Sequence, residues 1–264
     1  MKTVDVEFYN TNNQKLIGEI YIPESESKTV CPCVLNLHGL GGKGMTSQSY
    51  ISVGKQLAKL GFIYLNFNLS GIFPSEGKFE ESTFSKYIDD LESAIKFMKS
   101  LDYIDGDSIS LIGTSMGGAV ALNEALKNPK IKSLVMVAGV SSIEKWYNKH
   151  FNLELIEEIK KTGFWNRQLN VGLEKKCLNY EFMKDWITYS FKDKLQNIKC
   201  PVLIIQGDQD MSIPIEWSQD LYDNLQTKKE IQIISGADHK FHGLIDKKEK
   251  FIIKHFIELL NISK

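Results

Sequence analysis

The residues of this sequence best suited to chemistry surround Ser115, which lies in the stretch Gly113-Thr114-Ser115-Met116-Gly117. An apolar run precedes this G-x-S-x-G pattern and helix-forming residues follow it, which is typical of a strand, a sharp turn and a helix. Glycines on both sides of the serine permit the tight turn, and the turn exposes the serine Oγ at a helix N-terminus. The pattern therefore predicts a serine nucleophile at position 115.

A serine becomes a nucleophile only when a base takes its proton, and a third group must orient that base. Two loops near the C-terminus could supply these groups. The apolar run 202–205 leads into a loop with Asp208 and Asp210, and the run 231–234 leads into a loop with His239 and His242. Only one aspartate and one histidine can complete a triad, so their spacing leaves both alternatives open.

The remaining sequence indicates the elements that must position these loops. Residues 4–8 and 16–22 alternate as in an antiparallel hairpin. After them, apolar runs at 33–37, 62–67, 108–113, 131–138, 202–206 and 231–234 alternate with helical periodicity at 46–60, 83–100, 116–128, 215–226 and 244–260. Strands that are apolar on both faces, each followed by a helix, predict an α/β fold with a mostly parallel sheet of about eight strands, covered by helices on both faces. Active-site groups are then expected at the carboxyl ends of the strands.

One long segment interrupts this alternation and is too long for a plain connection. We predict that residues 141–198 form an inserted cap and that residues 1–140 and 199–264 form the core. The segment holds 10 of the 28 aromatic residues of the chain, which is a high density for a connection. We expect Trp146, Trp165 and Trp186 to give an apolar wall to a substrate pocket, and at least half of the aromatic residues to form the cap's own core.

The charge composition excludes several classes of partner. The chain has 32 basic and 33 acidic residues and a net charge of -1, so nucleic acid and anionic membranes are not expected as partners. Arg167 is the single arginine, so no arginine cluster can recognise carboxylate or phosphate groups. Arg167 itself could anchor a substrate carboxylate or be a solvated residue of the cap. The expected partner is a small molecule.

The four cysteines show no paired spacing typical of a metal site, so we predict neither a metal nor another cofactor. The N-terminus has no apolar signal-like stretch, and no run approaches the 18 apolar residues that cross a bilayer. We therefore expect a cytoplasmic protein without stable insertion into membranes. The sequence does not decide the oligomeric state, and a homodimer is compatible with it.

The sequence resembles the α/β-hydrolase superfamily, and within it the capped carboxylesterases of the feruloyl or cinnamoyl esterase and monoacylglycerol lipase kind. The resemblance covers nearly the whole chain outside the cap, and the order Ser115, Asp210, His239 is the order in which such hydrolases carry their triad. Four motifs carry it: His38-Gly39-Leu40-Gly41-Gly42, Gly113-Thr114-Ser115-Met116-Gly117-Gly118, Gly207-Asp208-Gln209-Asp210 and Gly236-Ala237-Asp238-His239.

The resemblance implies that Ser115 is the nucleophile, Asp210 the acid that orients the base, and His239 the base. It also implies that the backbone N–H groups of Leu40 and Met116 form an oxyanion hole, in which each donor lowers the barrier by about 3 kcal/mol. The activity implied is hydrolysis of carboxylic esters with a hydrophobic acyl or aryl group through an acyl-enzyme. A thioesterase, an acylaminopeptidase-like hydrolase and a non-catalytic binding protein of this fold are the alternatives.

The sequence departs from these esterases after the fourth strand, where they usually have Asp-x-Arg-Gly-His-Gly-x-Ser. This chain has Asn68 and Ser70 at the Asp and Arg positions. An ion pair is expected to be lost by replacement of both partners together, since one partner alone would leave an unpaired charge. The two replacements in this chain fit such a loss. Ile72 and Phe73 could then intrude on the acyl pocket.

Three further histidines are expected to have no role as a base. His38 is expected to be a structural hydrogen-bonding residue of the oxyanion loop. His150 and His255 are expected at the surface.

Overall fold

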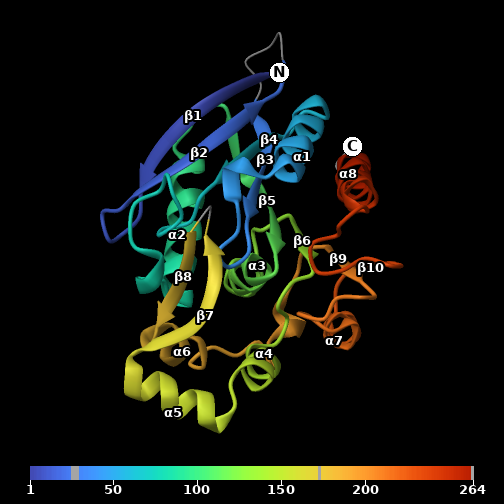
Figure 1. The fold of residues 1–264 in the computed structure, drawn as a ribbon. Helices are drawn as coiled ribbons and strands as arrows, with labels where there is room; N and C mark the ends of the chain where they lie inside the picture. The colour runs from blue at the N-terminus through green and yellow to red at the C-terminus, as the bar shows by residue number, and fades with distance from the viewer. Residues whose placement is uncertain (25–29, 172–173, 263–264) are drawn as a thin grey trace.

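An eight-stranded sheet forms the centre of the molecule in the computed structural model (Figure 1), which describes residues 1–24, 30–171 and 174–262. The side chains of residues 166–175, Arg167 among them, lie outside this description. The strand order is β1-β2-β4-β3-β5-β6-β9-β10. The strands are β1 (Lys2–Tyr9), β2 (Lys15–Ile22), β3 (Cys31–Leu37), β4 (Ile63–Phe67), β5 (Ile104–Thr114), β6 (Ser133–Val137), β9 (Val202–Gly207) and β10 (Lys229–Ile234).

Six neighbouring strands, from β4 to β10, pair in parallel, and the hairpin β1–β2 adds two strands by antiparallel pairing with β4. This confirms the predicted hairpin and the mostly parallel sheet. Because the six parallel strands point the same way, their carboxyl ends meet at one edge. That edge carries the loops after β3, β5, β9 and β10, which hold the candidate residues.

Helices cover both faces of the sheet, as predicted. They are α1 (Gln48–Lys59), α2 (Phe84–Lys99), α3 (Met116–Lys127), α7 (Ile215–Asn224) and α8 (Ile245–Ile262), with short 3₁₀ turns at Gly44–Thr46, Phe79–Glu81 and Leu195–Asn197. Thr83 begins α2 by accepting a hydrogen bond from the Lys86 N–H, which satisfies one of the free N–H groups of the first turn.

Two apolar cores lie on the two faces of the sheet. Successive residues of one strand point to opposite faces, so Leu35 and Leu111 contribute to the core under α2 and α3, whereas Val34 and Ile112 contribute to the core under α1 and α8. All four side chains are almost completely buried. This packing explains the runs of consecutive apolar residues in the sequence, and truncating one such leucine to alanine should cost about 2 to 5 kcal/mol.

The described part of the segment between β6 and β9 contains three α-helices and a separate two-stranded antiparallel sheet. Figure 1 shows these helices at the lower end of the molecule and the two strands above them. The elements of the segment are α4 (Ile143–His150), α5 (Leu153–Thr162), β7 (Phe164–Val171), β8 (Glu174–Asn179) and α6 (Tyr180–Trp186). Asn152 caps the start of α5, and Gly163 ends it in the left-handed conformation with φ 80°. We call residues 141–198 the cap segment. The helix and strand boundaries within it were not predicted from the sequence.

Polar contacts join the cap segment to the core on two sides. The carboxylate of Asp185, in α6, accepts hydrogen bonds from the backbone N–H of Ser85, at 2.8 Å, and from the Ser85 hydroxyl, at the start of α2. On the other side, Lys145 forms an ion pair with Asp220 of α7, and the Ser141 hydroxyl donates to the Trp217 carbonyl oxygen at 2.9 Å. These contacts hold the segment against both α2 and α7.

The prediction that His255 lies at the surface is wrong. It is 9% exposed, and its Nε2 lies 2.5 Å from the hydroxyl of Ser133. Burial lowers the pKa of His255 to about 4, so the ring is neutral at physiological pH. His150 is partly exposed, and its ring centroid lies 4.5 Å from that of Trp146.

Candidate active site

Ser115 lies at the sharp turn between β5 and α3, with φ 54° and ψ -117°. This backbone conformation is rare for a residue other than glycine and persists only when the surroundings enforce it. Here the Ser115 N–H donates to the Val137 carbonyl oxygen, and the Ser115 carbonyl oxygen accepts from the N–H groups of Gly118 and Val140, each at 3.0 Å. The turn is therefore held from three directions, and it places the serine side chain at the carboxyl edge of the sheet.

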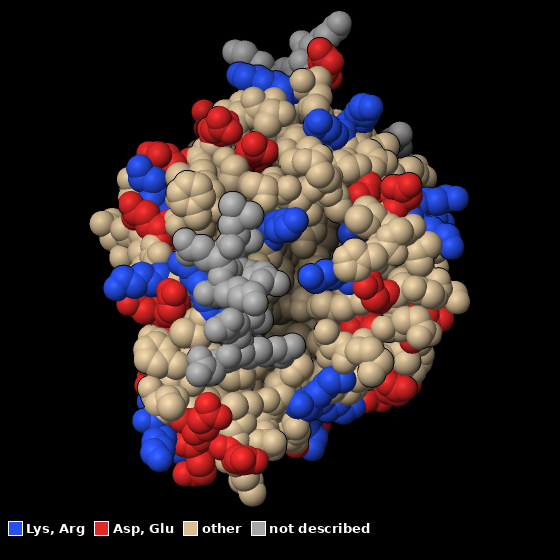
Figure 2. All heavy atoms as spheres, viewed as in Figure 1, with Lys and Arg blue, Asp and Glu red and all other residues tan. Residues whose placement is uncertain are grey.

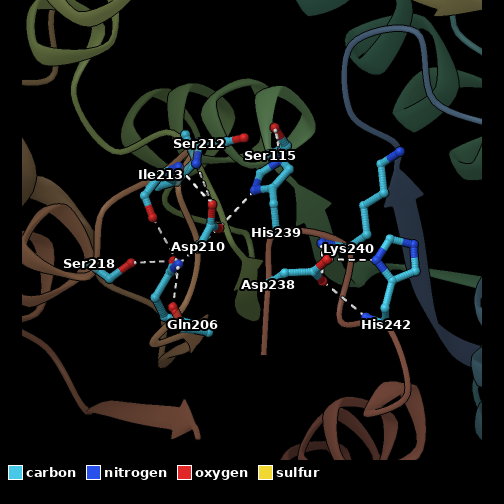
Figure 3. Close-up of polar contacts among 11 residues, drawn as sticks. Ser115, Gln206, Asp210, Ser212, Ile213, Ser218, Asp238, His239, Lys240 and His242 are labelled. Atoms are coloured by element: carbon cyan, nitrogen blue, oxygen red, sulfur yellow. Dashed lines mark hydrogen bonds and ion pairs between the residues drawn. The ribbon is translucent and has the colours of Figure 1, made fainter. Parts of the chain in front are cut away.

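Three side chains from three strand ends form a continuous line of hydrogen bonds, which Figure 3 shows. The Nε2 atom of His239 lies 3.1 Å from the Oγ of Ser115, and its Nδ1 lies 2.8 Å from the Oδ2 of Asp210. A carboxylate can only accept, so Nδ1 carries the imidazole proton and Nε2 is left to accept the serine proton. Parallel strands whose turns end at one edge thus bring together residues that lie 95 or more positions from Ser115 in the chain.

The carboxylate of Asp210 is completely buried, and its two oxygens accept four hydrogen bonds. Its Oδ1 accepts from the backbone N–H groups of Ser212 and Ile213, each at 2.8 Å, and its Oδ2 accepts from Gln206 Nε2 at 3.0 Å and from His239. Burial raises the pKa of Asp210, but the hydrogen bonds and the charge of its partners outweigh burial and lower the pKa below its usual value. Asp210 is therefore ionised at neutral pH and can accept the Nδ1 proton of His239.

The two alternatives left open by the sequence occupy other positions. Asp208 accepts from the Gly236 N–H at 2.7 Å and so joins the loop after β9 to the loop after β10. His242 is 71% exposed at its side chain, and its Nδ1 lies 2.6 Å from Asp238 Oδ2, pointing away from Ser115 in Figure 3. The structure therefore brings Asp210 and His239 to Ser115, and it brings neither Asp208 nor His242 there.

The backbone near Ser115 offers donors for a developing oxyanion. Met116 is the first residue of α3, so its N–H belongs to the free donors of the helix N-terminus. Gly39, the residue before Leu40, packs so closely on the serine that a Cβ on it would lie 3.1 Å from the Ser115 Cβ. The assignment of the Leu40 and Met116 N–H groups to an oxyanion hole stays a prediction.

The sequence from residue 49 to residue 259 matches the prolyl oligopeptidase family. This match covers most of the chain. The chain belongs to the prolyl oligopeptidase family. Among curated relatives, human palmitoyl-protein thioesterase ABHD10, mitochondrial, is 28% identical over 209 residues, which are 75% of this chain and 66% of the relative.

Solved structures of other proteins have the same fold as this chain. Est1E from Butyrivibrio proteoclasticus, with ferulic acid bound, superposes with a TM-score of 0.84 and 21% identity, and the match covers 98% of this chain and 100% of that one. Mouse alpha/beta hydrolase domain-containing protein 10 superposes with a TM-score of 0.78 and 19% identity over 99% and 100% of the two chains. The α/β-hydrolase fold predicted from the sequence is thereby confirmed, and the chain belongs to this superfamily, which includes its esterase-like relatives.

The three cap tryptophans expected to line a pocket are instead buried among one another. Trp146, Trp165 and Trp186 are 6%, 3% and 0% exposed. The ring centroid of Trp146 lies 6.0 Å from that of Trp165 and 4.9 Å from that of Trp186, and Trp186 also packs edge-on against Phe84 of α2 at 4.8 Å. This burial leaves them little surface for a ligand, so direct contact of these three side chains with a substrate stays a prediction that their burial disfavours.

The loop after β4 also differs from what its sequence suggested. Phe73 is 88% exposed, so its side chain does not enter the protein, and Ile72 is buried in the core beneath α2 and α3. His38 has the structural role expected of it: the Leu69 N–H donates to its Nε2 at 3.1 Å, and its Nδ1 donates to the Gly39 carbonyl oxygen at 2.8 Å. Burial lowers the pKa of His38 to about 4 and keeps the ring neutral.

Sequence reasoning missed Gln206, which holds Asp210 and the loop around it. Its side chain is completely buried, its Nε2 donates to Asp210 Oδ2 and to the Ile213 carbonyl oxygen, each at 3.0 Å, and its Oε1 accepts from the Ser218 hydroxyl at 2.8 Å. The signal was present, because a glutamine ends an otherwise apolar strand immediately before the acidic loop. A polar side chain in such a place requires a partner.

Figure 2 shows a hollow near the middle of the face of the molecule seen in Figure 1, with basic side chains at its rim. Within the described ranges, no helix is long and apolar enough to cross a membrane.

Proposed function

We propose that this protein is a serine hydrolase that cleaves carboxylic esters with a hydrophobic acyl or aryl group through an acyl-enzyme intermediate. The observation that carries the proposal is the hydrogen-bonded line from Ser115 Oγ through His239 to Asp210, with separations of 3.1 and 2.8 Å. These are the distances at which a base can take a proton from a nucleophile and be held by an acid. A non-catalytic protein of this fold usually lacks one of the three side chains, and this chain has all three.

In the first half of the reaction, Ser115 Oγ attacks the ester carbonyl carbon while His239 Nε2 takes the serine proton. The carbonyl oxygen becomes an oxyanion, which the N–H groups of Leu40 and Met116 stabilise together with the N-terminus of α3. The buried carboxylate of Asp210 stabilises the imidazolium that forms. When the tetrahedral intermediate collapses, His239 gives its proton to the leaving oxygen, and an alcohol departs from the acyl-enzyme.

In the second half, a water molecule takes the place of the alcohol. His239 removes one proton from it as it attacks the acyl carbon, and the same proton returns to Ser115 Oγ when the carboxylic acid is released. Neither half requires a metal or another cofactor.

The acyl or aryl group is proposed to bind in the cleft between the core and the cap segment, with the core formed by residues 1–140 and 199–264 and the cap by residues 141–198. Cap aromatics support this placement indirectly, because their cluster packs on Phe84 and so sets the position of the cap against the core. The preference for hydrophobic acyl or aryl groups then comes from the cleft as a whole more than from direct contact with one tryptophan ring. The location of the protein in the cytoplasm stays a prediction.

A thioester is the second candidate substrate, because curated relatives at up to 28% identity over three quarters of this chain are named palmitoyl-protein thioesterases. The proposed machinery suits both bonds, since only the leaving group differs and a thiolate leaves more readily than an alkoxide. The name of the prolyl oligopeptidase family makes an amide bond the third arm of the test.

Active-site titration with a fluorophosphonate tests the proposal. One phosphonyl group per chain should attach to Ser115 in the wild type and none in Ser115→Ala. Hydrolysis rates on oxygen-ester, thioester and amide substrates with the same acyl group, from acetyl to palmitoyl and feruloyl, then rank the three bonds and the acyl groups. Labelling that persists in folded Ser115→Ala would overturn the assignment of the nucleophile, and rates that do not rise with acyl size would overturn the hydrophobic preference.

A further inference from the structure

Two loops leave the carboxyl edge of the sheet side by side. The oxyanion loop, residues 38–47, follows β3, and a second loop, residues 68–77, follows β4. The strands β3 and β4 pair in parallel, with Asn36 opposite Asn66, so the two loops begin next to each other. The second loop is the part of the chain that departs from the pattern of the esterases it resembles.

Asn68 connects these two loops with both halves of its amide. Its Oδ1 accepts from the backbone N–H of Met45, in the oxyanion loop, at 2.8 Å. Its Nδ2 donates to the carbonyl oxygen of Phe73, in the second loop, at 2.7 Å. Asn68 is 1% exposed, so water cannot replace either bond. An aspartate could not serve here, because a carboxylate has no proton to donate to the Phe73 carbonyl oxygen.

The oxyanion loop is packed directly on this amide. A Cβ on Gly44, where φ is +46°, would lie 1.7 Å from Asn68 Oδ1, so the loop can follow this path only with glycine at that position. The Asn68 carbonyl oxygen also accepts from the Ser75 hydroxyl at 2.6 Å, which fixes the asparagine backbone. Asn68 is therefore a rigid support on which the loop rests.

A second contact holds the other end of the oxyanion loop. The Leu69 N–H donates to His38 Nε2 at 3.1 Å, and His38 Nδ1 donates to the Gly39 carbonyl oxygen at 2.8 Å. The second loop thus grips the oxyanion loop before Leu40 through His38 and after Leu40 through Met45. Between these two points lies the N–H group assigned to the oxyanion.

We propose that Asn68 is a positioning residue for the oxyanion hole, which acts on the reaction only by fixing the loop that carries Leu40. The inference rests on the proposed function. It explains why the Asp and Arg of the resembled pattern could both be absent: an amide that donates and accepts ties the two loops together without a buried charge.

The test compares Asn68→Asp and Asn68→Ala with the wild type on one ester. At pH 8, both variants should lower kcat about 10- to 100-fold, since losing one oxyanion donor entirely costs about 100- to 1,000-fold. KM should stay within about twofold. The affinity for a trifluoromethyl ketone with the same acyl group, which forms an oxyanion adduct with Ser115, should fall by the same factor as kcat. A general loss of structure would not link these two quantities.

The pH dependence separates the two variants. A protonated carboxyl group can donate to Phe73 and accept from Met45 as the amide does, so the deficit of Asn68→Asp in ketone affinity, relative to the wild type at the same pH, should shrink as the pH falls. The deficit of Asn68→Ala should stay constant. Asn66→Asp is the matched control, because Asn66 is equally buried two residues earlier on β4 and bonds to Asn36 at 3.3 Å instead of to the oxyanion loop.

Unchanged kcat and ketone affinity in both Asn68 variants would overturn the inference, as would an equal loss in Asn66→Asp at the same melting temperature. If Asn68→Asp does not fold, Asn68→Ala alone decides through the agreement of kcat and ketone affinity. If the wild type cleaves no ester or thioester, the proposed function fails, and the rate constant of phosphonylation still measures the hole, because the phosphoryl oxygen binds to the same donors.

Discussion

Two histidine–aspartate pairs lie at the carboxyl edge of the sheet and look alike in distance. The nitrogen–oxygen separations are 2.8 Å for His239 and Asp210 and 2.6 Å for His242 and Asp238. Their surroundings differ: side-chain exposure is 25% and 0% in the first pair and 71% and 45% in the second. Only the first pair points at Ser115. A short contact between histidine and aspartate is therefore not a sign of catalysis unless the pair is shielded from water and aimed at a nucleophile.

The largest expected effect comes from removing each histidine in turn. His239→Ala should lower kcat by about 10⁴- to 10⁶-fold, as Ser115→Ala should, because members of a triad act as a unit. His242→Ala should stay within about threefold of the wild type, since its ring is solvated and does not reach the serine. Steady-state kinetics on one ester, with circular dichroism as a control for folding, measure both. Equal losses in the two variants would erase the distinction between the pairs.

A smaller effect is expected from converting each aspartate to asparagine. Asp210→Asn should lower kcat by about 10³- to 10⁴-fold, because the new amide would donate to Nδ1 and leave the imidazole proton on Nε2, where it blocks acceptance of the serine proton. Asp238→Asn should change kcat by no more than about threefold. The same kinetic assay decides, and a strong loss in Asp238→Asn would show that the exposed pair takes part in the reaction.

The parallel sheet and the turn at Ser115 could be predicted from the sequence because each depends on local information. The alternation of apolar runs and helices identifies the parallel sheet, and a glycine-flanked serine at a strand end identifies the turn. The residues alone leave Asp208 and Asp210 both open, since the two lie in one loop and only the backbone path decides which carboxylate faces His239. The choice of Asp210 came from the resemblance to the α/β-hydrolases. In the structure, Asp208 accepts a hydrogen bond from the Gly236 N–H, whereas Asp210 accepts one from His239.

The side-chain packing of the cap segment could not be predicted in the same way, because contacts between residues distant in sequence determine it. Trp186 packs against Phe84, about a hundred residues earlier, and no local pattern indicates this contact. The prediction that His255 lies at the surface was wrong for a different reason. This residue lies three residues after the buried Ile252 and next to the buried Phe256, so helical periodicity already put it on the apolar face of α8. Helical periodicity does not reveal the polar partner that a buried histidine needs, which here is Ser133.

Another buried carboxylate sharpens the comparison, because it separates the effect of burial from the effect of pairing with a histidine. Asp90, in α2, is 0% exposed and accepts from Ser70 N at 2.7 Å and Asn10 Nδ2 at 2.8 Å. Burial raises its pKa from 3.8 to about 6, and these hydrogen bonds only partly offset burial. The folded state therefore binds a proton more tightly than the unfolded state, so this contribution to stability is complete below pH 4 and is lost as the pH rises towards 6.

Urea unfolding between pH 4 and 7 measures this contribution, which should amount to about 3 kcal/mol at most, since one pKa unit is worth about 1.4 kcal/mol. Asp90→Asn should remove that part of the pH dependence. Asp210→Asn should act in the opposite sense: the pKa of Asp210 is lowered, so its contribution is present above the unfolded pKa and lost as the pH falls through the folded one. An Asp90→Asn variant with the slope of the wild type would contradict the role of burial.

The smallest expected effect is that of chelators. Because the proposed proton transfers run between Ser115, His239 and the substrate, incubation with EDTA should leave kcat/KM of both the wild type and His242→Ala unchanged within error. A loss of activity that zinc restores would mean that the exposed pair, or another group, holds a metal needed for the reaction.

The packing of Gly117 has a consequence for the history of such chains. A Cβ at this position would lie 2.4 Å from the Leu37 carbonyl oxygen, so any other residue would push α3 away from the end of β3. Ser115 and His239 are under no such restriction, since a smaller side chain fits in place of either. In a lineage released from selection for activity, the nucleophile and the base should drift first, while Gly117 should persist for as long as the chain still folds.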